Sequence, residues 1–445
     1  MSAPAAEPLK GKIRPMNVSI IGTGHVGLIT GACLAERGHK VLCVDSDERK
    51  IKLLKSRKMP IYEPGLEPLV AKNVKAGRLH FGGTNAEAVS YGKVIFICVP
   101  TPPTASGGAD LSYIESVSRD IARALDDYRL VVEKSTVPVR TGGHVKSVIG
   151  KYAKKGIDFD VASNPEFLRE GSAIADTLHP DRIVFGVETH RAEMILRDLY
   201  KPFKAPIVVT DIKSAELIKH ASNSFLALKI SYANALAAVC EKAGASVTEV
   251  VRGMGMDQRI GASFLNAGIG YGGSCFPKDV AAFEAISRDL GYDFGILREV
   301  MKVNQDARES FIRKVEEELW IVKGKTICAL GLSFKPNTDD LRESVGLAVV
   351  QRLAEKGAKV RAYDPQAMEK AKTHLKDVTF CSSALDAAQG ADCALLLTEW
   401  DEFREIDWKK MKKAMAHPTL VDGRNLFDPG KMREMGFTYR SVGRP

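Results

Sequence analysis

The first part of the chain alternates short apolar segments with longer amphipathic ones. Residues 17–21 are apolar, residues 28–38 follow with helical spacing, and residues 40–44 are apolar again. Further apolar segments occupy residues 94–99, 130–134 and 160–163. This alternation predicts an α/β domain whose strands build an open sheet.

A longer helical pattern occupies residues 211–243. Its apolar residues stand at positions 217, 218, 221, 225, 228, 235, 236 and 239. At 1.5 Å per residue, the predicted helix is roughly 45 Å long. A helix of this length bridges domains or builds a dimer, and further helices are expected through about residue 318.

The last third of the chain repeats the first in a degenerate form. The segment AEKGAKVRAYD at residues 354–364 matches AERGHKVLCVD at residues 35–45, and residues 326–331 resemble residues 18–22. The second copy lacks the remaining glycines of the first and has residues 333–342 inserted instead. It predicts a second Rossmann-like domain that binds a nucleotide other than NAD. Within the insertion, Lys335 and Arg342 are either phosphate contacts or solvated loop residues.

Composition fits this multidomain picture. The chain has 445 residues, of which 45% are hydrophobic and 27% charged, so two or three globular domains are expected. The formal charge of +9 is spread along the sequence and suits anionic small ligands such as dinucleotides. A local cluster of lysines favours a solvated helix face over a nucleic-acid site, and comprises Lys409, Lys410, Lys412 and Lys413.

The cysteines and the N-terminal residues predict a cytoplasmic protein. None of the eight cysteines forms a CxxC pair, and several lie in apolar segments, so reduced thiols in a cytoplasmic protein are expected and no metal site is predicted. Residues 1–15 are rich in Ala and Pro without an apolar core, which predicts a disordered tail and no signal peptide. No apolar run reaches membrane-spanning length, so we expect a soluble protein without a membrane partner.

The first predicted turn carries a glycine motif. Gly22, Gly24 and Gly27 form GxGxxG between a strand and a helix, and Asp45 ends the next strand. Glycines let the backbone approach a pyrophosphate at the helix N-terminus, while the acid binds ribose hydroxyls and repels a 2′-phosphate. The alternative is a tight turn with a capping acid, but the full context favours an NAD-binding Rossmann-like domain.

Other polar residues follow strands or lie on helices. Thr101 and Thr136 stand in threonine-proline turns after two apolar strands, where open α/β sheets bind ligands, although such residues also simply form turns. Glu166 and Glu170 share a face if their segment is helical, as an active pair or as helix-dipole compensation. Lys219, with Asn223 four residues later, could stabilise an oxyanion or be solvated at the surface.

A glycine-rich cysteine loop is the most distinctive stretch. The sequence GYGGSCFPKD places Cys275 after Gly270, Gly272 and Gly273 and before Lys278 and Asp279. An isolated cysteine is usually a small buried hydrophobe. The neighbouring cation and carboxylate favour a nucleophilic thiolate here.

Taken together, these motifs identify a family resemblance. GTGHVG, VPTP, STVP, NPEFLREG, Lys219 with Asn223, FLNAGIGYGGSCFPKD and SFKPNTDDLRES occur in this order over about residues 16–430. The chain resembles the UDP-glucose/GDP-mannose dehydrogenase family. The cysteine loop is similar to that of the branch acting on UDP-glucose. The branches for GDP-mannose and UDP-N-acetylmannosamine typically vary around this cysteine.

The resemblance implies a reaction and roles for residues. Such enzymes oxidise a primary alcohol to a carboxylate with two NAD and one water, through a thiohemiacetal and a thioester. The implied catalytic residues are Cys275, Lys219, Asn223, Asp279, Glu166 and Thr136. The implied cofactor-binding residues are Gly22, Gly24, His25, Val26, Gly27, Asp45, Lys50, Thr101, Thr136, Glu170, Lys278 and Arg342. The implied substrate-binding residues are Glu166, Phe167, Leu168, Arg169, Glu170, Lys219, Asn223, Arg259, Phe264, Leu265, Asn266, Ala267, Gly268, Gly272, Lys335 and Arg424.

The resemblance also implies an organisation. It gives an NAD-binding domain at residues 16–212, a helical dimerisation domain with the cysteine loop at 213–320, and a UDP-sugar-binding domain at 321–445. UDP-glucose is the expected substrate, and Arg259 is expected to reach across a homodimer interface. Three alternatives stay open: another nucleotide sugar oxidised by the same mechanism, a two-electron β-hydroxyacid-type dehydrogenase, and a catalytically inactive nucleotide-binding regulator.

Overall fold

Apolar strands and amphipathic helices alternate as the sequence predicts. The computed structural model describes residues 14–104 and 107–445, so most of the predicted N-terminal tail, residues 1–13, lies outside the described residues. By its contacts the chain divides into two compact units. The first contains the residues up to Pro102 together with Ala109–Lys219, and the second contains His220–Pro445 with a short segment that begins at Pro103.

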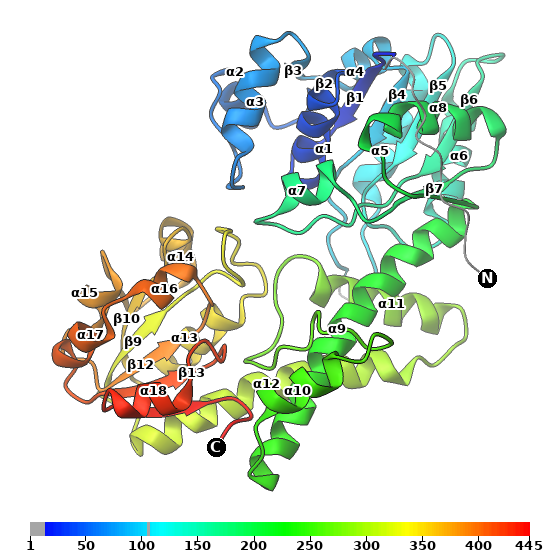
Figure 1. Cartoon of the computed structure of the whole chain (residues 1–445). Helices are drawn as coiled ribbons and strands as arrows, with labels where there is room; N and C mark the ends of the chain where they lie inside the picture. The colour runs from blue at the N-terminus through cyan, green and yellow to red at the C-terminus, as the bar shows by residue number, and fades with distance from the viewer. Residues whose placement is uncertain (1–13, 105–106) are drawn as a thin grey trace. The chain divides into compact units, whose positions relative to one another are not determined.

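A parallel sheet forms the centre of the first unit (Figure 1). Its strands lie in the order β3-β2-β1-β4-β5-β6-β7-β8, and only the β6–β7 pair is antiparallel among the described strands. The strands are β1 (Asn17–Ile21), β2 (Lys40–Val44), β3 (Leu79–Gly82), β4 (Val94–Ile97), β5 (Arg129–Glu133), β6 (Phe159–Ser163), β7 (Ile183–Gly186) and β8 (Ile207–Thr210). The order 3-2-1-4-5-6 is that of the doubly wound dinucleotide-binding fold.

Helices cover both faces of this sheet. They are α1 (His25–Glu36), α2 (Glu48–Lys55), α3 (Leu66–Lys75), α4 (Asn85–Tyr91), α5 (Ser112–Ala124), α6 (Thr141–Tyr152), α7 (Ala173–Leu178), α8 (His190–Tyr200) and the 3-10 turn η1 (Lys201–Phe203). Neighbouring residues of a strand enter opposite cores: Phe96 packs in one buried cluster and Ile95 in the other. Burial on both faces explains why these strands read as continuous apolar runs.

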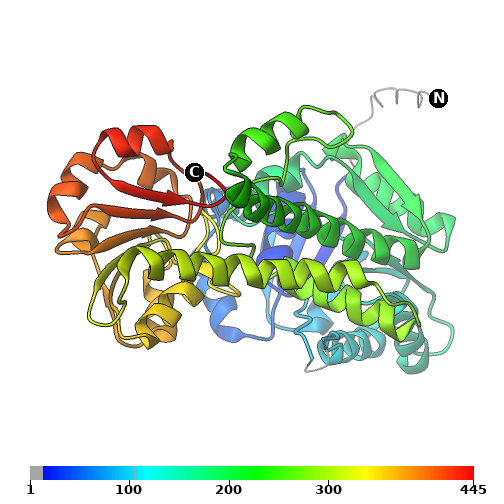
Figure 2. The same cartoon turned by 90° about the horizontal axis from the view of Figure 1, so that it is seen from below.

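The long helix α9 (Ile212–Ala243) has 32 residues, close to the predicted 211–243. The boundary between the two units falls within it, after Lys219. In the second unit, α9 is accompanied by α10 (Val247–Gly255), α11 (Phe276–Asp289) and α12 (Gly295–Leu319). The α9 and α12 helices lie side by side in Figure 2. The Ser231 hydroxyl of α9 donates to the Val300 carbonyl of α12 at 2.8 Å.

A second sheet follows these helices, with every pair parallel and the order β11-β10-β9-β12-β13-β14. Its strands are β9 (Thr326–Leu330), β10 (Lys359–Tyr363), β11 (Val378–Phe380), β12 (Cys393–Leu396), β13 (Thr419–Asp422) and β14 (Thr438–Ser441). Its helices are α13 (Val345–Glu355), α14 (Met368–His374), α15 (Ala384–Ala388), α16 (Asp401–Glu405), α17 (Trp408–Ala414) and α18 (Pro429–Glu434). The predicted fold class, with two Rossmann-like domains and a long central helix, is confirmed.

Candidate functional site

The turn between β1 and α1 needs glycine at two positions for steric reasons. Gly22 has φ +101°, and a Cβ there would lie 2.4 Å from the Cys98 carbonyl oxygen. A Cβ at Gly27 would lie 1.9 Å from the Gly22 carbonyl oxygen. At Gly24 a Cβ would meet no heavy atom of the described residues within 4 Å. Gly22 and Gly27 are therefore required by the turn itself, whereas Gly24 leaves open space beside the backbone.

Asp45 is fixed behind this turn. Its Oδ2 accepts hydrogen bonds from the Thr23 amide and hydroxyl, both at 2.8 Å, and its Oδ1 accepts from the Asp47 amide at 2.9 Å. Burial alone would raise the pKa of Asp45, but these bonds and Lys50, whose Nζ is 3.4 Å away, hold it below its usual range. The carboxylate is thus ionised and partly exposed, as binding of ribose hydroxyls requires. The sequence interpretation overlooked Thr23, although its place inside the glycine motif was visible.

This turn fits the pyrophosphate of a dinucleotide. Gly24 occupies the N-cap of α1 and brings no side chain to the helix end, so the first amides stay available to an anion. His25 and Val26 form the half-buried first turn of α1. His25 Nε2 lies 3.8 Å from Glu63 Oε2.

The two threonine-proline turns lie next to one another. They follow the paired strands β4 and β5, and the Thr101 hydroxyl donates to the Thr136 carbonyl at 2.9 Å. Thr101 is buried and Thr136 half-buried. The structure therefore brings these two predicted residues together at the carboxyl edge of the sheet.

The segment after β6 is extended, and no helix forms over residues 164–169. Glu166 and Glu170 are both buried, so the alternative of helix-dipole compensation does not apply to them. Glu166 accepts from Lys219 Nζ twice, at 2.7 Å through its carbonyl and at 2.8 Å through Oε1. Lys219 is therefore a buried, paired lysine and not a surface one.

The next three residues of this segment make contacts of their own. The Arg182 guanidinium lies 3.7 Å from the centre of the Phe167 ring, and the Leu168 amide donates to Glu166. Arg169 pairs with Asp176 at 2.7 Å.

Cys275 lies at the N-cap of α11 and is the exposed member of the eight cysteines, all of which the structure describes. The other seven are buried, and burial raises the pKa of Cys33 and of Cys98 to about 12. Glycine is required in the loop: a Cβ at Gly272 would lie 2.1 Å from the Glu343 carbonyl oxygen, and one at Gly273 would lie 2.5 Å from the Phe334 ring. The loop thus presents the one thiol that is accessible to a substrate.

Asp279 and Asn223 meet within the second unit. The Asn223 Nδ2 donates to Asp279 Oδ2 at 2.6 Å, and the Asp279 amide donates to the Cys275 carbonyl at 2.8 Å. Asp279 is 1% exposed, and among the described residues its Oδ1 has no hydrogen-bond partner, with Lys278 Nζ 3.7 Å away. The buried carboxylate thus contacts the Asn223 amide through one oxygen and faces the Lys278 ammonium with the other.

The predicted substrate-binding residues of the second unit differ in their surroundings. Leu265, Ala267 and Gly268 are buried and Asn266 is exposed, while Phe264 has φ +66°. Arg259 is exposed and pairs with Asp257 at 2.6 Å. Lys335 lies over the Phe334 ring, and Arg342 pairs with Asp340. Arg424 donates to the carbonyls of Leu397 and Gly270 at 2.8 and 3.2 Å, which ties the cysteine loop to the second sheet.

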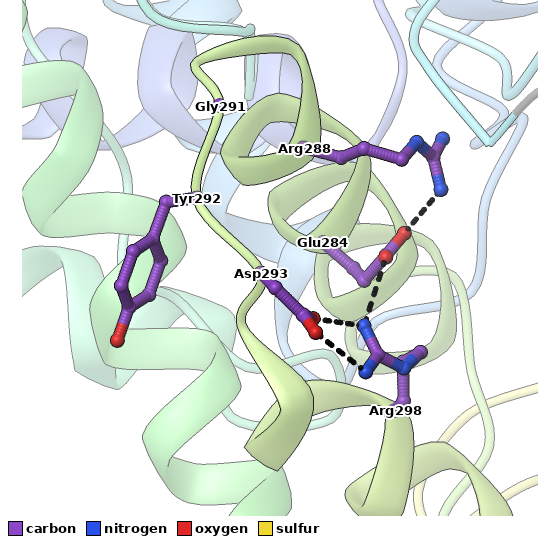
Figure 3. A pocket seen from close by; sticks show the side chains of 6 residues that line it. All are labelled: Glu284, Arg288, Gly291, Tyr292, Asp293 and Arg298. Atoms are coloured by element: carbon purple, nitrogen blue, oxygen red, sulfur yellow. Dashed lines mark hydrogen bonds and ion pairs between the residues drawn. The ribbon is translucent and has the colours of Figure 1, made fainter.

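A separate hollow of about 300 Å³ lies between α11 and α12, at the end of α11 opposite Cys275 (Figure 3). Arg288 pairs with Glu284 at 3.0 Å, Arg298 pairs with Asp293, and Tyr292 points away from these charges (Figure 3). Because its arginines are matched by carboxylates, we assign this hollow no catalytic role.

The described residues offer neither a membrane-spanning helix nor a metal site. Within residues 14–104 and 107–445, none of the helices combines the length and apolar character of a membrane crossing. The same residues contain no group of three or more His, Cys, Asp or Glu side chains placed to hold a metal ion.

Family models match three consecutive parts of the chain. All belong to the UDP-glucose/GDP-mannose dehydrogenase family: its NAD-binding domain matches residues 16–204, its central domain residues 213–306, and its UDP-binding domain residues 328–429.

Individual proteins agree with these models. The chain is 46% identical to a UDP-glucose 6-dehydrogenase of Bacillus subtilis (strain 168), covering 96% of this chain and 93% of the relative. It is 45% identical to a UDP-glucose 6-dehydrogenase of Rhizobium meliloti (strain 1021), covering 97% and 100%. The solved structure of a UDP-glucose dehydrogenase from Pyrobaculum islandicum superposes with a TM-score of 0.91 at 39% identity, covering 97% and 98%. The structure of a UDP-D-ManNAc dehydrogenase from Pyrococcus horikoshii superposes with a TM-score of 0.85 at 28% identity, and the match covers 96% of this chain and 99% of that chain.

Proposed function

Because this chain belongs to the UDP-glucose/GDP-mannose dehydrogenase family, we propose that it is an NAD-dependent UDP-glucose 6-dehydrogenase. It oxidises UDP-glucose to UDP-glucuronate with two NAD and one water. The observation that carries this proposal is the exposed Cys275 at the start of α11, with the buried Asp279 one helical turn later. A two-electron dehydrogenase has no need for such a thiol.

Binding of the pyrophosphate and of a ribose of the cofactor is assigned to the first unit. Gly22, Gly24 and Gly27 with the α1 N-terminus would hold the pyrophosphate, and the Asp45 carboxylate would accept hydrogen bonds from the ribose hydroxyls. NAD, when bound, accepts a hydride at each of two oxidation levels. Further cofactor contacts proposed are His25, Val26, Lys50, Thr101, Thr136, Glu170, Lys278 and Arg342.

Covalent chemistry is assigned to Cys275. Its thiolate adds to the aldehyde carbon, and the C–S bond keeps the intermediate as a thiohemiacetal and then, one oxidation level higher, as a thioester. Water opens the thioester, which releases the carboxylate and restores the thiolate. Lys219 and Asn223 stabilise charge on the reacting oxygen, Asp279 takes a proton from the attacking water, and Thr136 and Glu166 orient these groups.

Substrate contacts and domain limits remain part of the proposal. The residues assigned to the UDP-sugar are 166–170, Lys219, Asn223, Arg259, 264–268, Gly272, Lys335 and Arg424. The functional domains are residues 16–212, 213–320 and 321–445.

We also propose a cytoplasmic location, because eight thiols without a disulfide suit a reducing compartment. The product, a nucleotide-activated acidic sugar, suits polysaccharide biosynthesis.

A homodimer is supported by α9. Phe225, Tyr232 and Val239 are 60%, 54% and 61% exposed and follow at intervals of seven, with Leu228 and Ala235 between them. Alternating steps of three and four give the apolar seam of a helix pair. We propose that two copies pair here and that Arg259 serves the partner's site. Tyr232→Asp should give monomers in sedimentation velocity, whereas Leu290→Asp, at another exposed apolar position, should not.

The deciding experiment counts NADH per UDP-glucose consumed and identifies the product. Two NADH and UDP-glucuronate are expected, whereas one NADH would indicate the two-electron alternative. Faster turnover of GDP-mannose would indicate another nucleotide-sugar branch, and binding without turnover would indicate an inactive regulator.

Variants test the mechanism separately. Cys275→Ser should bind both ligands yet produce no acid, while Cys381→Ser, at a buried thiol, should remain active. Undiminished acid production by Cys275→Ser would remove the covalent mechanism. Lys219→Ala should lower kcat more than it raises KM, because the ammonium acts on transition-state charge.

A further inference from the structure

The first unit contains a second buried lysine, Lys134, directly after β5. Its side chain is 7% exposed, and its Nζ lies 5.9 Å from the centre of the Phe96 ring. The Nζ donates to Asn164 Oδ1 at 3.0 Å and to the Asn164 carbonyl at 3.3 Å. Lys134 thus holds one asparagine by both its side chain and its backbone.

Asn164 also forms hydrogen bonds with three other residues of the first unit. Its amide donates to the Glu133 carbonyl at 2.8 Å, and its Nδ2 donates to the Val184 carbonyl at 2.9 Å. Its Oδ1 also accepts from the Tyr200 hydroxyl at 2.5 Å. Asn164 is 1% exposed, so these bonds are shielded from water and fix its place between the neighbouring strands.

The anchored residue lies two positions before Glu166. Pro165 stands between them, and its ring fixes its own φ and restricts the backbone of Asn164 before it. Glu166 is held to Lys219 Nζ through its carbonyl and its carboxylate, at 2.7 and 2.8 Å. A shift of Asn164 would therefore be passed to both acceptors of Lys219.

Electrostatics links the two lysines as well. Burial lowers the pKa of Lys134 to about 8, the Cys98 and Glu166 groups raise it, and Lys219 lowers it. Burying an ammonium costs several kcal/mol, and an apolar side chain of similar length would avoid that cost. The cost of burying this charge has to be offset by its hydrogen bonds to Asn164.

We propose that Lys134 is a positioning residue: by fixing Asn164 it sets the Asn164–Glu166 segment so that Glu166 holds Lys219 in its reactive orientation. The inference rests on the proposed function, because it assumes that Lys219 acts on the substrate. A purely structural role would instead predict that Lys134 affects stability and leaves catalysis unchanged.

The test uses three variants of the full chain. Lys134→Met keeps the length of the side chain and removes the ammonium, Lys134→Arg keeps charge and donors, and Lys146→Met makes the same change at an exposed ion pair with Glu188. For Lys134→Met we expect kcat to fall about 10–100-fold, with the KM values for NAD and UDP-glucose within about two-fold. Lys134→Arg should restore most of kcat, and Lys146→Met should equal the wild type.

Crystal structures of the variants supply a readout that does not depend on turnover. In Lys134→Met, the distances from Lys219 Nζ to Glu166 should exceed hydrogen-bond length, and in Lys134→Arg they should be kept. Unchanged kcat together with unchanged distances in Lys134→Met would overturn the proposal. If that variant does not fold, Lys134→Gln, which keeps donors without charge, takes its place.

A wild-type protein that does not oxidise UDP-glucose refutes the proposed function, and the Lys219–Glu166 distances in the variants still decide what Lys134 positions.

Discussion

The two Rossmann-like domains carry the same acid at the same place and use it differently. In each, an aspartate directly follows the second strand, β2 or β10. The amide of the first turn glycine donates to the last residue of that strand: Gly22 to the Val44 carbonyl and Gly331 to the Tyr363 carbonyl, both at 2.8 Å. Asp45 and Asp364 therefore occupy equivalent positions. Their surroundings separate a ligand-binding turn from a structural one.

Asp364 is fully used by its own domain. Its Oδ2 accepts from the Leu332 and Ser333 amides at 2.7 and 2.9 Å, and its Oδ1 accepts from the Gln366 and Ala367 amides at 2.9 and 2.7 Å. The Ser333 hydroxyl and the Trp400 indole add to these, and Asp364 is 1% exposed. A carboxylate enclosed in this way cannot bind a ribose.

The helices after the two turns also begin differently. Gly24 brings no side chain to the start of α1, whereas the Ser344 hydroxyl caps α13 by accepting from the Leu347 amide at 3.2 Å. The second turn is longer, because Gly346 is the residue that packs against Gly331 as Gly27 packs against Gly22. The sequence interpretation missed this equivalence, since the second pair of glycines is fifteen positions apart and the first pair five. The open helix end suits an anionic ligand, and the capped end needs none.

Among variants that test this contrast, Asp364→Ala should cause the largest loss of folding stability. Removing the carboxylate leaves several buried amides without acceptors, so we expect a loss of at least about 3 kcal/mol in the stability of the second domain. Thermal unfolding followed by calorimetry measures it. Asp45→Ala is the matched control, and an equal loss of Tm in both variants would contradict the difference drawn here.

Gly27→Ala should come next. The added Cβ would overlap the Gly22 carbonyl oxygen at 1.9 Å, so the turn must move, at a cost of about 2–3 kcal/mol. Gly346→Ala meets the Gly331 oxygen at 3.2 Å and should change stability by less than about 1 kcal/mol. Denaturant midpoints compare the pair, and the contrast is lost if Gly346→Ala is the more damaging.

Asp45→Ala should affect binding more than folding. Loss of the charged acceptor of the ribose hydroxyls should raise the Kd for NAD about 10–100-fold and reduce the preference over NADP. Isothermal titration with each dinucleotide measures both changes. An unchanged Kd would mean that Asp45 is as structural as Asp364.

The smallest effect is expected for Gly24→Ala. No heavy atom of the described residues lies within 4 Å of the added Cβ, so Tm should stay within about 2 °C of the wild type. The methyl group would occupy the space beside the backbone that we assign to the pyrophosphate, so NAD should bind several-fold more weakly. Equal loss of stability and binding would place Gly24 with the structural glycines.

Much of the architecture could be predicted from the sequence because it depends on local pattern. Apolar runs bounded by turns gave β1, β2, β4, β5 and β6 of the first sheet, helical spacing gave α9 to within one residue at its start, and the repeated segment gave β9 and β10 of the second domain. The shorter strands, such as β3 and β8, were not predicted. The cysteine loop was likewise recognisable from its glycines, which the structure shows are needed for close packing.

Tertiary structure decided what these residues do, because burial and partners come from segments far apart in the chain. The missing glycines indicated that the second domain does not bind NAD, but the matching segments before Asp45 and Asp364 did not show that Asp364 is enclosed by Trp400 and by amides of its own domain. The spacing of Lys219 and Asn223 alone did not distinguish Lys219 from a surface lysine, because its burial depends on Glu166, which is 53 residues away in the chain. Lys134 looked like the end of a strand, and its hold on Asn164 exists only because β5 and β6 lie side by side.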